Sequence, residues 1–424
     1  MLNIKPNDRI VIIGGGFAGV QLIKRLKNKP VRITLIDKQN FHSFQPLLYQ
    51  VASARVEPAS ISFPFRKLFQ GFKNFDYRMA VVQRVDTEQK QVITDTGNIK
   101  YDHLVIATGC TTNFFGNNEL MKHALPMKAM SEAIEIRNRI LLDFEEYATA
   151  SSEEREKLMN IIIVGAGPTG VELSGAFAEL KNDVLPKDYP KVDFSGLDII
   201  LLEGSPNTLA NMSDDSKKMS RKYLESLGVR VKTEVILQSY DGHFATLSNG
   251  EIIPCKNLIW SAGVMGNVVE GVTERENLMR NRYIVDRYNA VQNMENVYAL
   301  GDVAYMETPL YPKGHPQVAN VAINQAKNLA QNFLNSMNDK PLTEYEYKDL
   351  GMMATIGKNK AVVDLKYIHF QGFVAWVVWM FLHLMLILSV RNKVIIFINW
   401  AWAYITKDTS LRLIIKSENK TKVV

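Results

Sequence analysis

Short apolar runs bounded by glycine or polar residues recur along the chain, and they predict buried strands that alternate with helices. Two of these runs, Arg9–Ile13 and Asn160–Val164, each lead directly into a glycine cluster. The pattern predicts further strands near 31–36, 79–85, 91–95, 99–106, 198–202 and 296–300, and helices near 131–147 and 317–336. Strands that alternate with helices in this way are typical of an α/β fold with parallel sheets.

Both glycine clusters have the form G-x-G-x-x-G, at 14–19 and at 165–170. In such a pattern the first glycine allows a tight turn, the second lets a diphosphate approach the backbone, and the third lets the helix pack on the strand. The diphosphate then binds the helix N-terminus, where free N–H groups and the helix dipole favour an anion. One pattern alone also fits an ordinary strand-to-helix turn. Two patterns, each in the right context, predict two dinucleotide sites.

An acidic residue follows each pattern at the end of the next predicted strand, Asp37 after the first and Glu203 after the second. A carboxylate at this place binds the hydroxyls of an adenosine ribose and repels a 2′-phosphate. Since no arginine follows within 204–207, the second site is expected to prefer NADH over NADPH. The alternative for each residue is a solvated acid at a strand end.

Composition narrows the chemistry further. The 424 residues suffice for two or three domains, and 46% of them are hydrophobic. The formal net charge is +6, and residues 391–424 alone hold seven Lys or Arg against two acids, a net of +5. The two cysteines, Cys110 and Cys255, have no metal or C-x-x-C spacing, which predicts a reducing compartment and no metal site, disulfide framework or redox dithiol. The chain enters its first predicted strand almost at once, so no signal peptide is expected.

The C-terminal part has a second pattern. Residues 372–390 contain one ionisable side chain, His383, and the segment 394–405 adds apolar and aromatic residues. Lys407, Arg412, Lys416, Lys420 and Lys422 follow. The apolar run is long enough for a membrane-spanning helix, but the aromatic and basic residues after it favour a helix lying on an anionic membrane surface. A buried core helix would explain only the apolar run.

Three segments carry a resemblance to a known family: FQPLLYQVA at 44–52, VGAGPTGVELSG at 164–175 and VYALGD at 297–302. Over nearly the whole chain, the sequence resembles the two-dinucleotide-binding-domain flavoproteins, and these segments are similar to type II NADH dehydrogenases, which are single-subunit, non-proton-pumping NADH:quinone oxidoreductases. The resemblance implies two Rossmann-like domains, with an FAD domain split by an inserted NADH domain. The implied boundaries are 1–113 and 265–345 for FAD, 114–264 for NADH, and 346–424 for a C-terminal membrane-associated region. The polar segment 149–157 is expected to lead into the second nucleotide fold.

The resemblance also implies site residues. For non-covalent FAD they are Gly14, Gly16, Phe17, Ala18, Gly19, Asp37, Lys38, Thr108, Gly109 and Asp302. For NADH they are Gly165, Gly167, Pro168, Thr169, Gly170, Glu172, Glu203, Ala262 and Gly263. Glu172 is the candidate catalytic residue, expected to position the nicotinamide and to influence proton uptake. The alternative is an acid that complements the dipole at a helix N-terminus.

The quinone contacts match the family less well. The family run Ala-Gln-x-Ala-x-Gln-Gln aligns with 319–325, where Asn320 and Asn324 replace glutamine and Gln325 is kept. Because asparagine is one methylene shorter, a quinone carbonyl would need a shifted position or a bridging water. The candidate quinone residues are Gln50, Gln317, Asn320, Asn324, Gln325 and His383. Asn and Gln on the solvent side of a helix would need no ligand.

The sequence therefore predicts an FAD-dependent enzyme that oxidises NADH and reduces a membrane quinone. The expected location is the cytoplasmic face of the cell inner membrane, as a peripheral protein that does not bind nucleic acid; the resemblance also allows a homodimer. Sulfide:quinone oxidoreductase is the nearest alternative enzyme, although it needs redox cysteines beside the flavin. A redox-sensing flavoprotein of the apoptosis-inducing-factor type is the alternative from another class.

Overall fold

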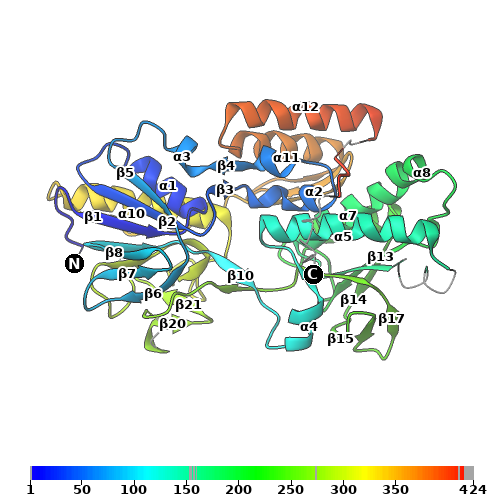
Figure 1. The fold of residues 1–424 in the computed structure, drawn as a ribbon, viewed down its shortest axis with the longest axis horizontal. Coiled ribbons are helices and arrows are strands. Elements are labelled where there is room, and N and C mark those ends of the chain that lie inside the picture. The colour runs from blue at the N-terminus through cyan, green and yellow to red at the C-terminus, as the bar shows by residue number, and fades with distance from the viewer. Residues whose placement is uncertain are drawn as a thin grey trace, which may run out of the picture. The chain divides into compact units, whose positions relative to one another are not determined.

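Parallel sheets lie at the centre of both parts of this chain. The computed structural model describes residues 2–151, 155, 158, 160–272, 275–408 and 411–414. The chain divides into two compact units, which we call unit 1 and unit 2 (Figure 1). Unit 1 consists of Met1–Ser43, Ser62–Thr111 and Val264–Asp349, and unit 2 of Phe44–Ile61, Thr112–Gly263 and Leu350–Val424.

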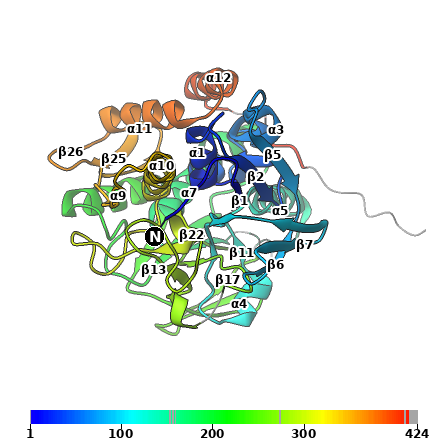
Figure 2. The ribbon, with the colours of Figure 1, turned by 90° about the vertical axis from the view of Figure 1, so that its left-hand side faces the viewer.

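Unit 1 is built on a five-stranded parallel sheet. Its strand order is β22 (Val297–Ala299), β9 (His103–Ile106), β1 (Arg9–Ile13), β2 (Arg32–Asp37) and β5 (Phe75–Met79). The central strands β1 and β9 are buried almost throughout, which explains their unbroken apolar runs. Helices α1 (Phe17–Arg25) and α10 (Ala319–Ser336) pack side by side (Figure 2).

Smaller elements complete unit 1. They are the pair β3 (Phe41–Ser43) and β4 (Ser62–Pro64), helix α3 (Phe65–Leu68), the antiparallel sheet β6 (Val82–Asp86), β7 (Gln91–Thr94) and β8 (Gly97–Lys100), the sheet β20 (Leu278–Met279), β21 (Arg282–Ile284) and β23 (Ala304–Tyr305), and the short 3-10 turn η5 (Gly301–Val303).

Unit 2 repeats the plan with a second five-stranded parallel sheet. The order is β11 (Leu125–Pro126), β18 (Asn257–Trp260), β12 (Asn160–Val164), β13 (Asp198–Glu203) and β14 (Val229–Thr233). The accompanying helices are α4 (Asn118–His123), α5 (Met130–Thr149), α7 (Pro168–Glu179), α8 (Leu185–Asp188) and α9 (Asp214–Ser226). A separate antiparallel sheet consists of β15 (Leu237–Tyr240), β16 (Phe244–Leu247) and β17 (Ile252–Pro254). Helix α7 continues through one π-helical turn, Leu180–Val184, into α8.

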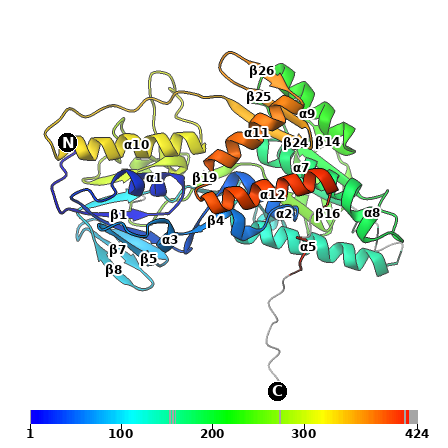
Figure 3. The same cartoon turned by 90° about the horizontal axis from the view of Figure 1, so that it is seen from above.

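The C-terminal elements belong to unit 2 as well. An antiparallel sheet of β24 (Met352–Gly357), β25 (Lys360–Asp364) and β26 (His369–Gln371) is followed by α11 (Phe373–Leu386) and α12 (Val390–Thr406). Helix α11 packs on β25, and α12 lies beside α11 and in front of α2 in Figure 3. The short helix α2 (Leu48–Ala52) packs against α5 and α7.

The apolar run 372–390 is not one helix. Helix α11 ends at Leu386 and α12 begins at Val390. Within the described residues, no helix combines the length and the apolar character needed to cross a membrane. Of the basic residues after this run, Lys407 and Arg412 are described, whereas Lys416, Lys420 and Lys422 lie outside the described residues, as does part of the polar segment 149–157.

Several predicted boundaries are wrong in an informative way. The single strand expected over 99–106 is two strands, β8 and β9, because Asp102 turns the chain: its carboxylate accepts the Arg9 N–H at 2.7 Å and its own N–H donates to the Arg9 carbonyl at 2.9 Å. The strand expected over 79–85 is likewise divided between β5 and β6. The helices expected over 131–147 and 317–336 are confirmed as α5 and α10.

Candidate active site

In the first glycine turn, in unit 1, neighbouring backbone crowds Gly14 and Gly19, whereas Gly16 has free space beside it. A Cβ on Gly14, where φ is +102°, would lie 2.5 Å from the Ala107 carbonyl oxygen, and a Cβ on Gly19 would lie 2.1 Å from the Gly14 carbonyl oxygen. These two glycines therefore let β1, β9 and α1 meet closely. At Gly16, by contrast, a Cβ would meet no described atom within 4 Å, and no described side chain caps α1 there. The turn thus has the open backbone approach that a diphosphate requires.

Asp37, at the end of β2, holds this turn. Its two carboxylate oxygens accept the N–H of Gly15 at 2.6 Å and the N–H of Gln39 at 2.8 Å. Burial raises the pKa of Asp37 more than these two N–H groups lower it. Lys38 is exposed beside it, whereas Phe17 and Ala18 begin α1, with the Phe17 ring edge-on to His42 at 5.3 Å.

The carboxyl ends of the neighbouring strands bring the remaining predicted FAD residues to the same edge of the sheet. Thr108 follows β9 and donates its hydroxyl to the Asn267 carbonyl at 2.6 Å. A Cβ on Gly109 would meet no described atom within 4 Å, so the backbone is open there too. Asp302, after β22, accepts a hydrogen bond from the Cys110 thiol at 2.9 Å. Two open backbone positions and a carboxylate at one sheet edge fit FAD.

The second glycine turn, in unit 2, has the same construction. A Cβ on Gly165 would lie 2.9 Å from Ala262, and one on Gly170 would lie 1.9 Å from the Gly165 carbonyl oxygen. At Gly167 no described atom lies within 4 Å of a Cβ position. Pro168 is the first residue of α7. Proline suits this position, because an N–H there would have no acceptor within the helix. Thr169 follows it and is exposed.

Glu203, at the end of β13, corresponds to Asp37. Its carboxylate accepts the Ala166 N–H at 2.7 Å and the Ser205 N–H at 2.8 Å. Glu203 therefore stabilises the second glycine turn as Asp37 stabilises the first. Ala262 and Gly263 follow β18 at the same sheet edge, and the preceding Ser261 donates its hydroxyl to the Val164 carbonyl at 2.8 Å. The residues predicted for NADH therefore gather at the carboxyl ends of three parallel strands.

Glu172 lies on α7, two residues after Gly170, and its side chain is buried. Its Oε1 accepts a long hydrogen bond, 3.4 Å, from the Thr355 N–H of β24. Burial raises the pKa of Glu172 to about 8, although the hydrogen bond from the Thr355 N–H lowers it. The Trp379 nitrogen itself is buried and reaches hydrogen-bond geometry with no described atom. Glu172 is therefore protonated below about pH 8, which a solvated helix-terminal acid would not be.

The predicted quinone residues of unit 1 lie on or just before α10. The Gln317 amide donates to the Asp302 carbonyl at 2.9 Å, and Gln325 accepts the Gly301 N–H at 2.7 Å while its own amide nitrogen is buried without a described partner. These two residues hold the backbone around Asp302. Asn320 is half-buried, and Asn324 accepts a hydrogen bond from Lys327 at 3.3 Å.

The predicted quinone residues of unit 2 are Gln50 and His383. The Gln50 amide donates to the Tyr49 hydroxyl and accepts from the Trp400 indole, both at 2.8 Å. The His383 ring is stacked on Trp379, with centroids 4.0 Å apart, and burial lowers the pKa of His383 to about 4, so it is neutral at pH 7.

Sequence reasoning missed the residues that surround Glu172. They line a cavity of unit 2 that includes Tyr49, Gln50, Arg55, Glu179, Thr355, Trp379 and Trp400. They come from α2 and the segment after it, α7, β24, α11 and α12, so no local motif joins them. The one available signal was the occurrence of tryptophans at 376, 379 and 400 in a segment interpreted only as membrane-facing.

Comparisons with known proteins agree with this arrangement. The family described as pyridine nucleotide-disulphide oxidoreductase matches residues 8–326, and the NDH2 C-terminal domain matches residues 350–407. The chain is 32% identical to the type II NADH:quinone oxidoreductase Ndh of Mycobacterium tuberculosis, over 94% of this chain and 88% of that protein. It is 27% identical to a mitochondrial internal alternative NAD(P)H-ubiquinone oxidoreductase of Arabidopsis thaliana, over 94% and 84%.

Solved structures show the same fold. NDH2 from Plasmodium falciparum, in complex with NADH, superposes with a TM-score of 0.88 at 22% identity, over 97% of this chain and 100% of that one. The sulfide:quinone oxidoreductase of Aquifex aeolicus superposes with a TM-score of 0.71 at 20% identity, over 91% and 92%. Because both enzymes share the fold, the fold alone does not separate them.

Substitution of Glu203 tests its expected role in nucleotide choice. Glu203→Gln keeps the shape of the side chain but removes the charge that binds the ribose hydroxyls and repels a 2′-phosphate. We expect the KM for NADH to rise about tenfold and the preference for NADH over NADPH, measured as the ratio of kcat/KM values, to fall. FAD content is the internal control. An unchanged ratio would mean that Glu203 only holds its turn.

Proposed function

The chain belongs to the type II NADH:quinone oxidoreductase family, and from this we propose that it oxidises NADH and passes two electrons to a membrane quinone without pumping protons. One observation carries the proposal. In each unit an open glycine turn follows a parallel strand, and a carboxylate at the end of the neighbouring strand accepts a backbone N–H of that turn. Two dinucleotides bound by one chain, one as cofactor and one as substrate, account for this duplication.

The turn of unit 1 is assigned to FAD. Gly14, Gly16 and Gly19 would hold the diphosphate, Asp37 the adenosine ribose, and Asp302 the ribityl and phosphate region. When bound, FAD supplies the acceptance of a hydride and the onward transfer of two electrons. The cysteines disfavour the sulfide-oxidising alternative. Burial raises the pKa of Cys255 to about 12, so this thiol stays protonated, and the Cys110 thiol donates a hydrogen bond to Asp302.

The turn of unit 2 is assigned to NADH. Gly165, Gly167 and Gly170 would hold the diphosphate and Glu203 the adenosine ribose. Glu172 would lie at the nicotinamide, where its carboxyl positions the ring and, being protonated below about pH 8, holds a proton in a buried site. The predicted quinone contacts through Gln50, Gln317, Asn320, Asn324, Gln325 and His383 belong to the same proposal.

The C-terminal helices are assigned to the membrane surface, on the cytoplasmic face of the inner membrane. Helix α12 has two sides: Asn392 and Ile396 are buried, with the Asn392 amide donating to the Ser60 carbonyl at 2.8 Å. The opposite side exposes Val390, Val394, Phe397, Ile398, Trp402 and Ile405, which recur at the three- and four-residue spacing of one helix face. An exposed apolar stripe of this kind suits the boundary between head groups and acyl chains.

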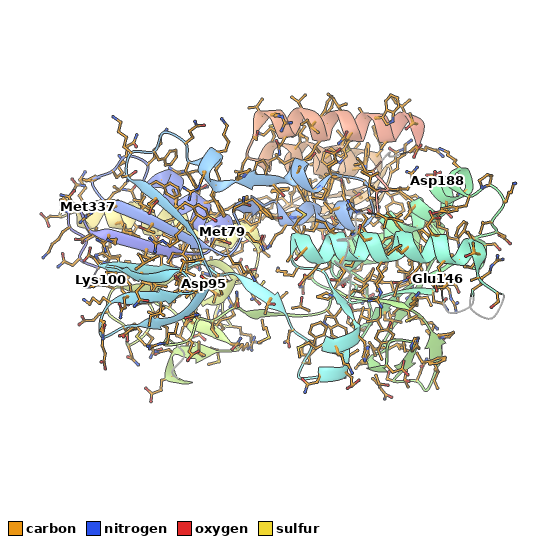
Figure 4. The ribbon with its side chains drawn as sticks, in the orientation of Figure 1. Met79, Asp95, Lys100, Glu146, Asp188 and Met337 are labelled. Carbon is orange, nitrogen blue, oxygen red and sulfur yellow. The ribbon has the colours of Figure 1, made fainter. Side chains whose placement is uncertain are left out.

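The basic residues contribute less to this attachment than their number suggests. Arg412 forms an ion pair with Asp188 at 2.5 Å, and Lys407 one with Asp183 at 3.3 Å, so both cations are neutralised within unit 2. Figure 4 labels Asp188 on α8. Apolar contact therefore supplies most of the binding that we propose.

Glu172→Gln tests the role of the buried carboxyl. The substitution keeps the volume and removes the group that titrates near pH 8. We expect the turnover of NADH with quinone to fall roughly tenfold or more and to lose its dependence on pH between about 7 and 9. FAD content and Tm should stay close to those of the unchanged protein. A lower Tm with full activity would instead support the role of a helix-dipole acid.

Two glutamates on the exposed stripe test the membrane assignment. In Phe397→Glu/Ile405→Glu, co-flotation with vesicles of anionic phospholipid should fall several-fold, because two charges would enter the apolar boundary. Oxidation of NADH by ferricyanide should be retained. The matched control is Met121→Glu/Ile236→Glu, which charges two equally exposed apolar positions of unit 2 outside the C-terminal helices. Equal flotation of both variants would contradict the assignment.

A further inference from the structure

A cavity of unit 2 runs along one side of α7. Its empty space is about 940 Å³ when the open solvent at its mouth is included, and its other walls come mainly from α2, β24, α11 and α12. Its lining includes the buried Glu172 and, eleven residues further along the chain, Asp183, which pairs with the exposed Lys407. The cavity therefore connects the buried carboxyl assigned to the nicotinamide site with exposed, charged residues.

Acidic residues mark both ends and the middle of this cavity. Glu172 and Glu179 are seven residues apart on α7, which places their side chains on the same side of this helix. Asp183 lies in the π-helical turn that follows and lines the same cavity. At 1.5 Å rise per residue, Glu179 is about 10 Å along the helix from Glu172. The distance is too long for direct proton transfer between the two carboxyls. Water molecules can bridge it, because the cavity offers them polar partners at Glu172, Glu179 and Arg55.

Glu179 is buried at the middle of the path and is held from two directions. Its carboxylate forms an ion pair with Arg55 and accepts the Lys358 N–H that follows β24. Near the mouth, Asp183 pairs with Lys407, and the Lys358 ammonium donates to the Tyr404 carbonyl at 2.6 Å. The turn that includes Asp183 is π-helical, a geometry that occurs often at functional sites.

The end at Glu172 is enclosed by weaker hydrogen-bonding groups. The Tyr49 hydroxyl comes from α2, the Thr355 N–H from β24, the Trp379 indole from α11 and the Trp400 indole from α12. Burial, with the neighbouring Glu172 charge, holds the pKa of Tyr49 well above its usual range, so Tyr49 stays neutral. Glu179 and Arg55 are the next charged groups along the cavity.

The overall reaction needs one proton from solvent. Oxidation of NADH by a quinone follows NADH + H⁺ + Q → NAD⁺ + QH₂, so the nicotinamide supplies one hydrogen nucleus and the medium supplies the other. With ferricyanide the balance is reversed: NADH reduces two ferricyanide ions, yields NAD⁺ and releases one proton. Only the first reaction takes up a proton.

We propose that this cavity is the route by which solvent delivers that proton to Glu172, with Glu179 as the relay halfway along it. The inference rests on the proposed function. Arg55 and the Lys358 N–H are positioning groups that hold the Glu179 carboxylate in the path, and the Asp183–Lys407 pair forms the entrance. Along the route, only O–H bonds to the transferred proton break and form.

Glu179→Gln tests the relay, because the amide keeps an oxygen for Arg55 and Lys358 but cannot exchange a proton between water molecules. In detergent-solubilised full-length holoenzyme, we expect quinone turnover to fall about tenfold or more and to decrease more steeply as pH rises. Ferricyanide turnover should stay within twofold of that of the unchanged protein. Imidazole buffer at fixed pH should restore quinone turnover in the variant, with no effect on the unchanged protein.

Asp143→Asn is the matched control, since Asp143 is an equally buried carboxylate paired with a lysine, Lys256, and lies outside the cavity. It should alter neither the quinone-to-ferricyanide ratio nor the response to imidazole. If Glu179→Gln fails to fold, Ala403→Phe narrows the cavity near its mouth and should give the same selective loss.

The outcomes separate the two proposals. Quinone turnover in Glu179→Gln that equals that of the unchanged protein across the pH range overturns the route. A rise in the KM for quinone, without a change in pH dependence, also overturns it and makes the cavity part of the quinone site. Absence of quinone turnover in the unchanged protein, with FAD bound and ferricyanide reduced, contradicts the proposed function itself.

Discussion

Helix α7 lies so close to strand β24 that only glycine fits between them. A Cβ on Gly175 would be 1.8 Å from the Ile356 carbonyl oxygen, and backbone rather than a flexible side chain occupies that place. The contact fixes the C-terminal sheet against the nucleotide helix within unit 2. It also brings the Thr355 N–H to Glu172 and the Lys358 N–H to Glu179. Thr355 lies on β24 one residue before Ile356, and Lys358 comes directly after the strand. The carboxyls and the cavity between them depend on this approach.

The same helix starts at the glycine turn assigned to NADH, so α7 and its π-helical continuation extend from that turn to the contacts with α12. Helix α12 is fixed to the far part of this element by Lys407 and Asp183, and to α2 by the bond from Trp400 to Gln50. A family that needs a nucleotide site, a buried carboxyl and a surface for a lipid-soluble substrate obtains all three along one helix. The turn of unit 1 repeats only the first of these features.

Local patterns predict the parts of this structure that depend on neighbours in sequence. The glycine turns and the acids Asp37 and Glu203 were predicted because strand, turn and strand-end residue lie close together in the sequence. The family resemblance supplied the split domain and the role that we propose for Glu172. The division of 99–106 into two strands was missed, because it depends on the contact between Asp102 and Arg9, far away in sequence.

The cavity could not be predicted for the same reason. The Trp400–Gln50 bond joins residues 350 positions apart, and the Arg55–Glu179 pair residues 124 apart. The basic tail shows a further limit: a charge count indicates attraction to an anionic surface, but it does not reveal that Asp183 and Asp188 neutralise two of the cations. Pairing of this kind depends on the folded chain and not on composition.

An anaerobic titration of the flavin absorbance tests the central claim most directly. The account predicts that about one equivalent of NADH bleaches the oxidised flavin band, that NADPH does so far less readily, and that about one equivalent of a quinone restores the band in the absence of oxygen. A band that NADH bleaches and quinone fails to restore would contradict the account, since the electrons would then leave to another acceptor.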